Sequence, residues 1–356
     1  MKILALNLPA YHEVEINNKV WGKGFTEWDN VKKGTKYFEN HYQPVVPLNQ
    51  WYYDLSKPED IEKQIELANR FGVDGFVYYH YWFGNGVQAL EKPMEILRNA
   101  IKKQIEYCFC WANQSWFTTW HGKSSEIIVK QEYGKEEEWV RHIKYLLSFF
   151  TDPRYIKVGN RPVLYVYNMS DIPDRRMFDV WNNILREEGF GDIYLIEFIS
   201  SKNKDISYDK TDAVVEFEPL YTTYFDLNKV QLAKRVVCKL FKTIDFQDYD
   251  VLWKKIIKRN RVYNGKAIYK GCFVGWDNSP RKAKNSMIVR NATPEKFEKN
   301  LEALIHNNRK DASNEFVLIN AWNEWSEGAY LEPDELNGFA YLQAIKNIKE
   351  SHESER

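Results

Sequence analysis

Short apolar runs recur along this chain of 356 residues, and segments with a helical pattern lie between them. Eight runs are expected to be strands: residues 3–8, 75–83, 107–111, 163–167, 193–199, 213–217, 272–275 and 316–319. Five segments are expected to be helices: residues 58–70, 92–103, 135–150, 173–188 and 294–308. Nearly continuous apolar strands that alternate with helices predict a parallel sheet buried on both faces. Eight repeats favour a closed (β/α)8 TIM barrel, of the α/β class, over an open doubly wound sheet.

The length of the chain permits two domains, but a (β/α)8 barrel often holds this many residues in one. We therefore expect residues 1–356 to form a single catalytic domain with two elaborations. Residues 19–51 form a long segment after the first strand, rich in aromatic residues, Gly and Pro, and are expected to contribute to a substrate wall. Residues 221–270 form a basic insertion between the sixth and seventh strands. We interpret this insertion as a solvated helical excursion, with binding of an acidic or phosphorylated glycan as the alternative.

Charge and composition narrow the classes of partner. The chain has 50 basic and 50 acidic residues, so its net charge indicates no general attraction to nucleic acid or to an anionic membrane. The 13 Trp and 23 Tyr are the unusual feature, because their rings combine an apolar body with a polar group and suit carbohydrate surfaces. The oligomeric state is left open.

Cellular location follows from what the sequence lacks. The four cysteines form no CxxC pair and no zinc-site spacing: Cys108, Cys110, Cys238 and Cys272. The first apolar run is too short for a signal peptide, and the sequence has no stretch long enough to span a membrane. These features predict a cytoplasmic protein with no membrane span, no bound metal and no cofactor.

Polar and aromatic residues follow nearly every expected strand. In (β/α)8 enzymes the reacting groups come from the C-terminal ends of several strands, so these positions are candidates for binding a sugar. The candidates are Tyr11, Tyr79, His80, Trp111, Asn113, Trp116, Trp276, Asp277 and Asn323. Three acids, Glu197, Glu216 and Glu218, also lie at strand ends. The alternative for each residue is a scaffold role, as a strand cap or a hydrogen-bonded core group.

The segment 316–334 reads FVLINAWNEWSEGAYLEPD and carries the clearest chemical signal. Its apolar run leads into Glu324 and Glu327, which stand among an amide and two indoles. Core packing has no use for these acids, whereas acid/base chemistry on a sugar needs carboxylates and flat aromatic faces. The two acids can converge only if the backbone leaves the extended form after Glu324, and Gly328 makes such a turn easy. The alternative is a surface acid pair at a loop mouth.

Seven motifs together resemble the WbsX-like proteins of bacterial surface-polysaccharide gene clusters, which are related to glycoside hydrolase family 99. They are WGKGFTEWDNV (21–31), HYQPVVP (41–47), GVDGFVYYHYWF (72–83), CWANQSW (110–116), DPRYIKVGNRPVLYVY (152–167), GWDNS (275–279) and INAWNEWSEGAYLEPD (319–334). The resemblance spans nearly the whole chain, and it is weakest in the basic insertion and after about Tyr341.

The resemblance implies a barrel enzyme that cleaves α-mannosidic bonds with retention of configuration. It places Glu324 as the base that assists attack of the substrate 2-hydroxyl on the anomeric carbon, giving a 1,2-anhydro sugar. It places Glu327 as the acid that protonates the leaving oxygen and then activates water. Ser326 departs from the pattern, because family 99 commonly has His at that position, so contacts near the acid are expected to differ.

Two other functions compete with a glycoside hydrolase. WbsX-like proteins are often described as glycosyltransferases of O-antigen or capsular polysaccharide biosynthesis, and metal-dependent transferases use a DxD motif. The chain contains one, Asp248-Tyr249-Asp250, but within the basic insertion and not after an expected strand. The third function is a non-catalytic glycan-binding module, against which the presence of both carboxylates argues.

Overall fold

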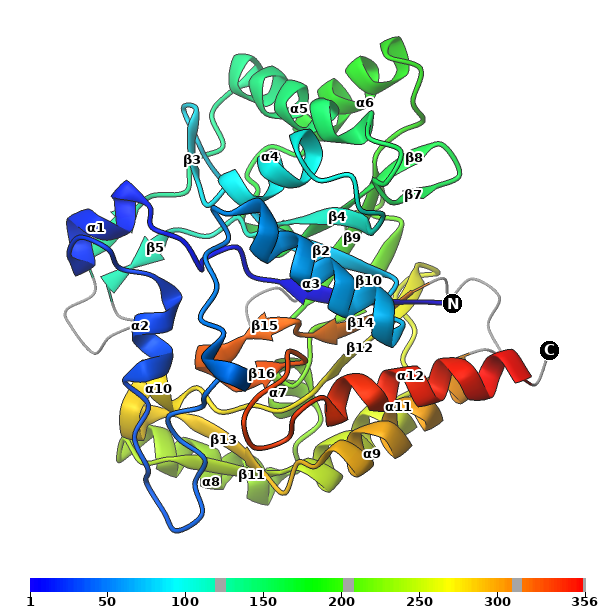
Figure 1. Cartoon of the computed structure of the whole chain (residues 1–356). Helices are drawn as coiled ribbons and strands as arrows, with labels where there is room; N and C mark the ends of the chain where they lie inside the picture. Colours follow the sequence, from blue (N-terminus) through cyan, green and yellow to red (C-terminus); the bar gives the residue numbers. More distant parts are fainter. Residues whose placement is uncertain (119–125, 201–207, 309–315, 355–356) are drawn as a thin grey trace.

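The computed structural model describes residues 1–118, 126–200, 208–308 and 316–354, and its centre is a closed parallel barrel (Figure 1). Its strands are hydrogen-bonded in the order β1-β14-β12-β10-β9-β8-β4-β2, and β1 pairs with β2 to close the ring. They are β1 (Lys2–Asn7), β2 (Gly75–Gly84), β4 (Glu106–Trp111), β8 (Arg161–Val166), β9 (Tyr194–Ile199), β10 (Ala213–Glu216), β12 (Ala267–Phe273) and β14 (Phe316–Asn320). The predicted (β/α)8 barrel is confirmed.

The seventh barrel strand begins earlier than the sequence predicts. We expected residues 272–275, whereas β12 covers Ala267–Phe273. Lys270 and Gly271 interrupt the apolar run that marks the other strands. Gly271 is nevertheless required there, because a Cβ at this position would lie 1.9 Å from the carbonyl oxygen of Glu216 on β10. The close approach of the β10 and β12 backbones therefore explains why Gly271 interrupts the apolar pattern of this strand.

Helices surround the barrel and bury one face against it. The expected helices are α3 (Pro58–Phe71), α4 (Lys92–Asn99), α5 (Glu136–Phe150), α6 (Met177–Glu187) and α11 (Pro294–Asn308). The last helix, α12 (Ala340–Ser354), lies against α11 (Figure 1). Helix α4 ends four residues before the predicted end, because the Arg154 guanidinium donates to the carbonyl oxygens of Leu97 at 2.9 Å and Ile101 at 2.8 Å. These bonds satisfy carbonyl groups that another helical turn would have used.

The long segment after β1 lies at one end of the barrel. It contains α1 (Glu15–Trp21), α2 (Glu27–Lys32) and the 3-10 turn η1 (Leu48–Gln50). Helix α2 contacts α10 (Ser279–Lys282) and the 3-10 turn η5 (Trp325–Glu327), so it lies beside the turn that carries Glu327 (Figure 1). The remaining short elements are β3 (Val87–Ala89), β5 (Trp116–Phe117), β6 (Ile127–Val129), β7 (Lys157–Val158), β15 (Asn323–Glu324), β16 (Ala329–Tyr330), η3 (Met169–Asp171) and η4 (Ala283–Asn285).

The basic insertion is mostly helical and contributes one strand to a small sheet outside the barrel. Its elements are α7 (Leu220–Phe225), α8 (Lys229–Leu240), β11 (Asp245–Asp248) and α9 (Tyr249–Lys258), and β11 pairs in parallel with β13 (Met287–Arg290). Within the described parts of the chain, no helix is both long enough and apolar enough to cross a bilayer.

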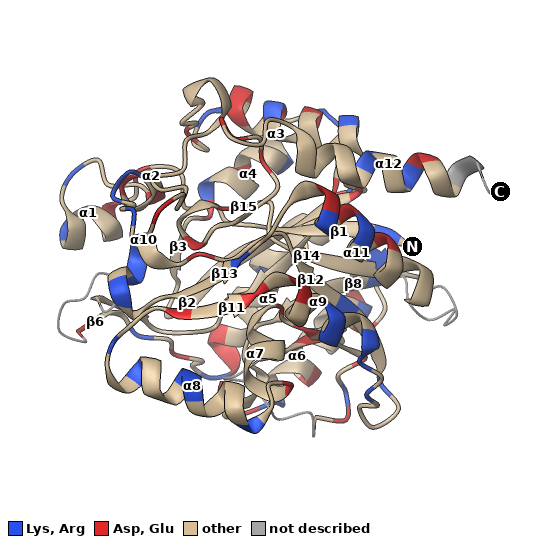
Figure 2. Ribbon diagram, turned by 90° about the horizontal axis from the view of Figure 1, so that it is seen from below, with Lys and Arg blue, Asp and Glu red and all other residues tan. Residues whose placement is uncertain are grey.

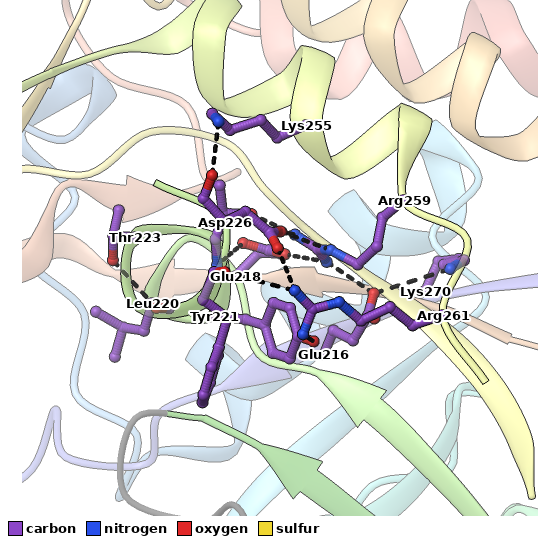
Figure 3. A network of polar contacts seen from close by, with 12 residues as sticks. Glu216, Glu218, Leu220, Tyr221, Thr223, Asp226, Lys255, Arg259, Arg261 and Lys270 are labelled. Atoms are coloured by element: carbon purple, nitrogen blue, oxygen red, sulfur yellow. Dashed lines mark hydrogen bonds and ion pairs between the residues drawn. The ribbon is translucent and has the colours of Figure 1, made fainter. Parts of the chain in front are cut away.

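A buried ion network joins the end of the insertion to β10 (Figure 3). Arg259 Nη1 lies 2.7 Å from Glu216 Oε2 and 2.7 Å from Glu218 Oε1, and its Nη2 lies 2.6 Å from Asp226 Oδ2. Burial raises the pKa of Glu218, and the Arg259 guanidinium opposes that shift. The guanidinium also stacks 4.2 Å from the ring centroid of Tyr221. Two of the strand-end acids in the sequence, Glu216 and Glu218, thus serve to anchor the insertion.

Replacing Arg259 by Met should destabilise the fold, because it leaves buried Glu218 without its counter-ion and Glu216 with only Lys270, at 3.8 Å. The expected loss in the free energy of unfolding is about 3–5 kcal/mol, measured by urea denaturation. Arg176→Met is the matched control, because Arg176 also pairs with an aspartate but its side chain is 81% exposed, against 3% for Arg259. Equal stability of the two variants would show that the network contributes nothing to the fold.

Candidate active site

The chain turns sharply between the last barrel strand and its two acids. After β14 comes the two-residue strand β15, then the 3-10 turn η5, and then Gly328 at φ 61° and ψ 24°. The predicted departure from the extended form after Glu324 is confirmed. A Cβ at residue 328 would lie 2.7 Å from the backbone nitrogen of Asp277, so both the left-handed conformation and the close approach require glycine.

One arginine gathers three carboxylates at this end of the barrel. Arg281 on α10 places Nη1 2.7 Å from Glu327 Oε1 and Nη2 3.4 Å from Glu324 Oε2. The same Nη2 lies 2.7 Å from Oε1 of Glu27, the first residue of α2. Ser326 donates a short hydrogen bond to that Glu27 oxygen. The two acids of the motif and the segment after β1 therefore meet at a single guanidinium, whose side chain is 8% exposed.

The two acids of the motif lie in different environments. Burial raises the pKa of Glu324 to about 8, the Arg281 charge opposes this shift, and the charges of Glu327 and Glu27 reinforce it. The side chain of Glu327 is 23% exposed, compared with 9% for Glu324. Pairs of carboxyl groups held in unlike surroundings are the usual arrangement for acid and base partners.

Tyrosines surround Glu324 on the inner face of the barrel. Tyr79 and Tyr81 lie two residues apart on β2 and so share a face, and burial together with the charge of Glu324 raises the pKa of both. Burial likewise raises the pKa of Tyr167, with contributions from Glu327 and Glu324. Trp116 lies against this group, with its ring centroid 5.1 Å from that of Tyr81. The predicted residues Tyr79 and Trp116 therefore lie in or beside the carboxylate site.

Two predicted residues hold the motif in place through their hydrogen bonds. Asn323 accepts from the Leu8 backbone nitrogen at 2.7 Å and donates to the Leu8 carbonyl oxygen at 3.0 Å, which ties the motif to the end of β1. Tyr11 donates to the Asn323 carbonyl oxygen at 2.5 Å and accepts from the Trp325 backbone nitrogen at 3.3 Å. Both side chains are fully buried, so their role is to position Glu324.

Glu332 orients the two indoles of the motif. Its carboxylate accepts from Trp322 Nε1 at 3.0 Å and from Trp325 Nε1 at 2.7 Å. It also accepts from the Tyr53 hydroxyl at 2.7 Å and from Gln64 Nε2 at 2.8 Å. Burial raises the pKa of Glu332 to about 7, and these four hydrogen bonds oppose the shift. A single buried carboxylate thus receives four donors and fixes the rings behind the site.

Asp277, a predicted sugar-binding residue, lies beside Glu327. Its backbone nitrogen donates to the Glu327 carbonyl oxygen at 2.6 Å, and its carboxylate accepts from His41 Nε2 at 2.8 Å and Gln43 Nε2 at 2.7 Å. Burial acts to raise the pKa of Asp277, but the hydrogen bonds from His41, Ser279 and Gln43 outweigh it and lower the pKa. The adjacent Trp276 is buried, and its Nε1 has no hydrogen-bond partner among the described residues.

His80 and Trp111 do not face the carboxylates, and their role in substrate binding stays a prediction. His80 Nε2 lies 2.9 Å from Nε2 of His142 on α5, and burial lowers the pKa of His80 to about 3. The ring of Trp111 lies 4.9 Å from that of His142, and its Nε1 donates to the Trp82 carbonyl oxygen at 3.1 Å. Both rings therefore pack in the layer between barrel and helices, on the face of the strands opposite to Tyr79.

Asn113 also has a scaffold role. Its Nδ2 donates to the Asn168 carbonyl oxygen at 2.7 Å and to the Tyr133 hydroxyl at 3.0 Å, and its Oδ1 accepts from the Asn168 backbone nitrogen at 2.8 Å. These bonds join the chain beyond β4 to the end of β8. With no exposed surface, the amide has no free donor to offer a sugar.

Five residues around the carboxylates escaped the sequence analysis: Glu27, Tyr81, Tyr167, Arg281 and Glu332. Glu27 and Glu332 stand inside recognised motifs, and Arg281 follows one by two residues. Tyr81 could have been found by strand alternation from Tyr79. For Arg281 the sequence offers no comparable signal, because its partner Glu27 is 254 residues away.

The DxD triplet has structural partners. Asp248 accepts from the Val251 backbone nitrogen at 3.0 Å and so caps α9, and it also accepts from Asn291 Nδ2 at 2.9 Å. Asp250 pairs with Lys296 at 2.7 Å. In the parts of the chain that the structure describes, no three His, Cys, Asp or Glu side chains are grouped as metal ligands would be.

The model of the family described as "Glycosyltransferase WbsX" matches residues 3–345 of this chain. The chain belongs to the WbsX family. It is also 32% identical, over 97% of its length, to WxcX of Xanthomonas campestris pv. campestris, from two strains. The WbsX-family chain spans about half the length of these curated relatives, since it covers 49% of each.

Solved structures of glycoside hydrolases share the fold. A glycoside hydrolase-like protein aligns with a TM-score of 0.61 at 13% identity, over 98% of this chain and 93% of its own. The GH99 endo-α-mannosidase of Bacteroides thetaiotaomicron aligns with a TM-score of 0.56 at 14% identity, over 99% and 98% of the two chains. The chain therefore combines membership of the WbsX family with a GH99-like barrel fold.

Glu332→Gln should loosen the site and the fold together. An amide nitrogen would face donors where a carboxylate oxygen now accepts two, so we expect a loss of about 2–4 kcal/mol in the free energy of unfolding. Thermal and urea denaturation measure this loss, and quenching of Trp322 and Trp325 fluorescence reports the loosened rings. Glu302→Gln, on the exposed side of α11, is the matched control. A Glu332→Gln protein as stable as that control would refute the orienting role.

Proposed function

We propose that this WbsX-family chain is a glycosidase that acts on an α-linked, mannose-like sugar of a bacterial surface polysaccharide. The observation that carries the proposal is the pair Glu324 and Glu327 at the C-terminal end of the barrel, joined through Arg281 and bordered by tyrosines. Binding alone requires no acid pair, whereas glycosidic cleavage requires two carboxyl groups with different tasks.

In the proposed first step Glu324 takes the proton of the substrate 2-hydroxyl. The freed oxygen attacks the anomeric carbon, the glycosidic C–O bond breaks, and Glu327 gives its proton to the leaving oxygen. The product is a 1,2-anhydro sugar. Glu324 must be ionised to act as this base, so with a pKa of about 8 turnover should rise as the pH rises towards 8. Once ionised, it is a stronger base than an ordinary glutamate, which suits proton removal from a hydroxyl.

In the second step Glu327 accepts a proton from water as the water oxygen attacks the anomeric carbon. The C1–O2 bond opens, and O2 recovers its proton from Glu324, so both carboxyl groups return to their starting states. Two inversions give net retention. The ion pair between Glu327 and Arg281 must open when substrate binds, because Glu327 needs a proton to begin the cycle.

A glycosyltransferase is the second candidate, because the description of the family names that activity. A hydroxyl of another sugar in place of water in the second step would make the same carboxylates catalyse transfer. Transfer from a nucleotide sugar would instead need a phosphate site, and the DxD aspartates already cap α9 and pair with Lys296. The carboxylate site thus favours hydrolysis, or transfer from a glycan donor.

Calorimetry with two classes of ligand tests the proposal. A cationic imino sugar and a 1,2-anhydro sugar should bind at micromolar concentration or tighter, because they imitate species on the route and the cation would lie beside two carboxylates. Nucleoside diphosphates should bind far more weakly at this acidic site. Micromolar binding of a nucleoside diphosphate without binding of the sugar mimics would favour the nucleotide-sugar transferase instead.

Glu327→Gln should retain binding of the sugar mimics and lose turnover of a polysaccharide substrate by about 10² to 10⁴, because the amide cannot donate the proton. Product analysis by chromatography measures the turnover. Glu335→Gln, an exposed acid eight residues further along, should behave as wild type. Full activity of folded Glu327→Gln would remove Glu327 from the mechanism.

A further inference from the structure

Helix α8 of the basic insertion faces the solvent with its apolar side. The stretch 229–242 reads KVQLAKRVVCKLFK and contains five basic residues and no acid. None of the α8 residues is buried. Val230, Val237, Leu240 and Phe241 are 79%, 51%, 74% and 74% exposed, and their spacing places them along one side of the helix. We call these four residues the α8 stripe.

The polar side of α8 faces the protein. Gln231, Arg235 and Cys238 are its half-buried residues. Arg235 donates a short bond to the Thr223 carbonyl oxygen, lies 3.4 Å from Asp245 Oδ2 and stacks 4.3 Å from the Tyr224 ring centroid. Polar contacts therefore hold the helix in an orientation that presents the α8 stripe outward.

Exposed apolar side chains are concentrated on this element. Of the thirteen large hydrophobic residues that are exposed among the described residues, six belong to the stretch 230–241. Single exposed apolar residues are ordinary, but a contiguous group marks a surface that another phase or molecule covers. Figure 2 shows α8 at the edge of the molecule, where a flat partner can reach it.

The charges around the stripe select the partner. Lys229, Lys234, Lys239 and Lys242 are exposed along the same stretch. By helical spacing Lys234 lies beside Val230 and Phe241, whereas Lys239 lies on the opposite side of α8. A second copy of the chain would bring these lysines against their own counterparts, which disfavours self-association. An apolar face with a lysine border is the pattern of a helix that lies in the interface of an anionic bilayer.

We propose that α8 docks the protein on the surface of an anionic lipid bilayer. The α8 stripe enters the boundary between headgroups and acyl chains, and the lysines beside it, such as Lys234, contact the lipid phosphates. The net charge of the whole chain is zero, so it does not reveal that the stretch 229–242 is basic.

Docking would bring the carboxylate site close to the bilayer. Helix α8 packs on β11, and β11 pairs with β13. Ile288 of β13 forms a bridge with Asp277, which borders Glu327. The helix is thus joined to the wall of the site through consecutive contacts. The docking itself stands on α8 alone and does not depend on the proposed reaction.

Co-sedimentation of the full chain with lipid vesicles tests the proposal. The protein should pellet with vesicles of phosphatidylcholine and phosphatidylglycerol in equal parts, and far less with phosphatidylcholine alone. The double substitution V237D/L240D should lower the partition coefficient by at least about tenfold, because it places charge in the apolar boundary. K234E/K239E should lower it by about fivefold or more per lysine, and added salt should weaken the wild type.

Leu336→Asp is the matched control, because Leu336 is 64% exposed on a different element and should leave partitioning unchanged. All substituted side chains are exposed, so the melting temperatures of the variants should equal that of wild type. If V237D/L240D does not fold, vesicle binding by K234E/K239E decides the outcome. The proposal would be overturned if the wild type did not bind the anionic vesicles. It would also be overturned if both double variants bound them as strongly as the wild type. A wild-type dimer in light scattering that V237D/L240D abolishes would show that a second copy covers the stripe instead.

Discussion

The buried guanidinium of Arg281 is the interaction on which the candidate site depends. It bonds to Glu27 from the segment after β1 and to Glu324 and Glu327 from the end of β14. Three acids that meet in a buried place would repel one another, and the cation makes their approach possible. Because α10, α2 and η5 all contact one another, this single side chain also joins the first and last parts of the barrel.

The segment 319–334 around Arg281 serves mainly to hold Glu324 and Glu327 in place. Asn323 and Tyr11 tie it to β1, and Glu332 fixes the indoles on either side. Gly328 permits the approach of Asp277. The short sequence around Glu324 and Glu327 is therefore dense in polar and aromatic residues because each acid needs a rigid support, as preorganised sites require.

Much of the fold was predictable because apolar runs and helical patterns are local signals. The eight strands and five of the helices follow from them, and β12 was misplaced only where Gly271 replaces a side chain by a close backbone contact. The orientation of side chains was harder to predict. All ten residues of β2 are buried, so hydropathy could not tell that Tyr79 faces the barrel interior and His80 the helices. Arg281 was missed because its role arises from contacts between distant parts of the chain.

Glu324, beside an arginine and a second acid, is a carboxyl group that loses its proton, and so becomes the proposed base, only at an unusually high pH. ¹³C NMR of protein labelled at the glutamate side-chain carboxyl carbons measures this directly, with Glu324→Gln assigning the resonance. We expect the Glu324 signal to titrate with a pKa of about 8. A Glu324 signal that titrates near 4.5, as an ordinary glutamate does, would contradict the buried and charge-coupled pair on which the proposed chemistry rests.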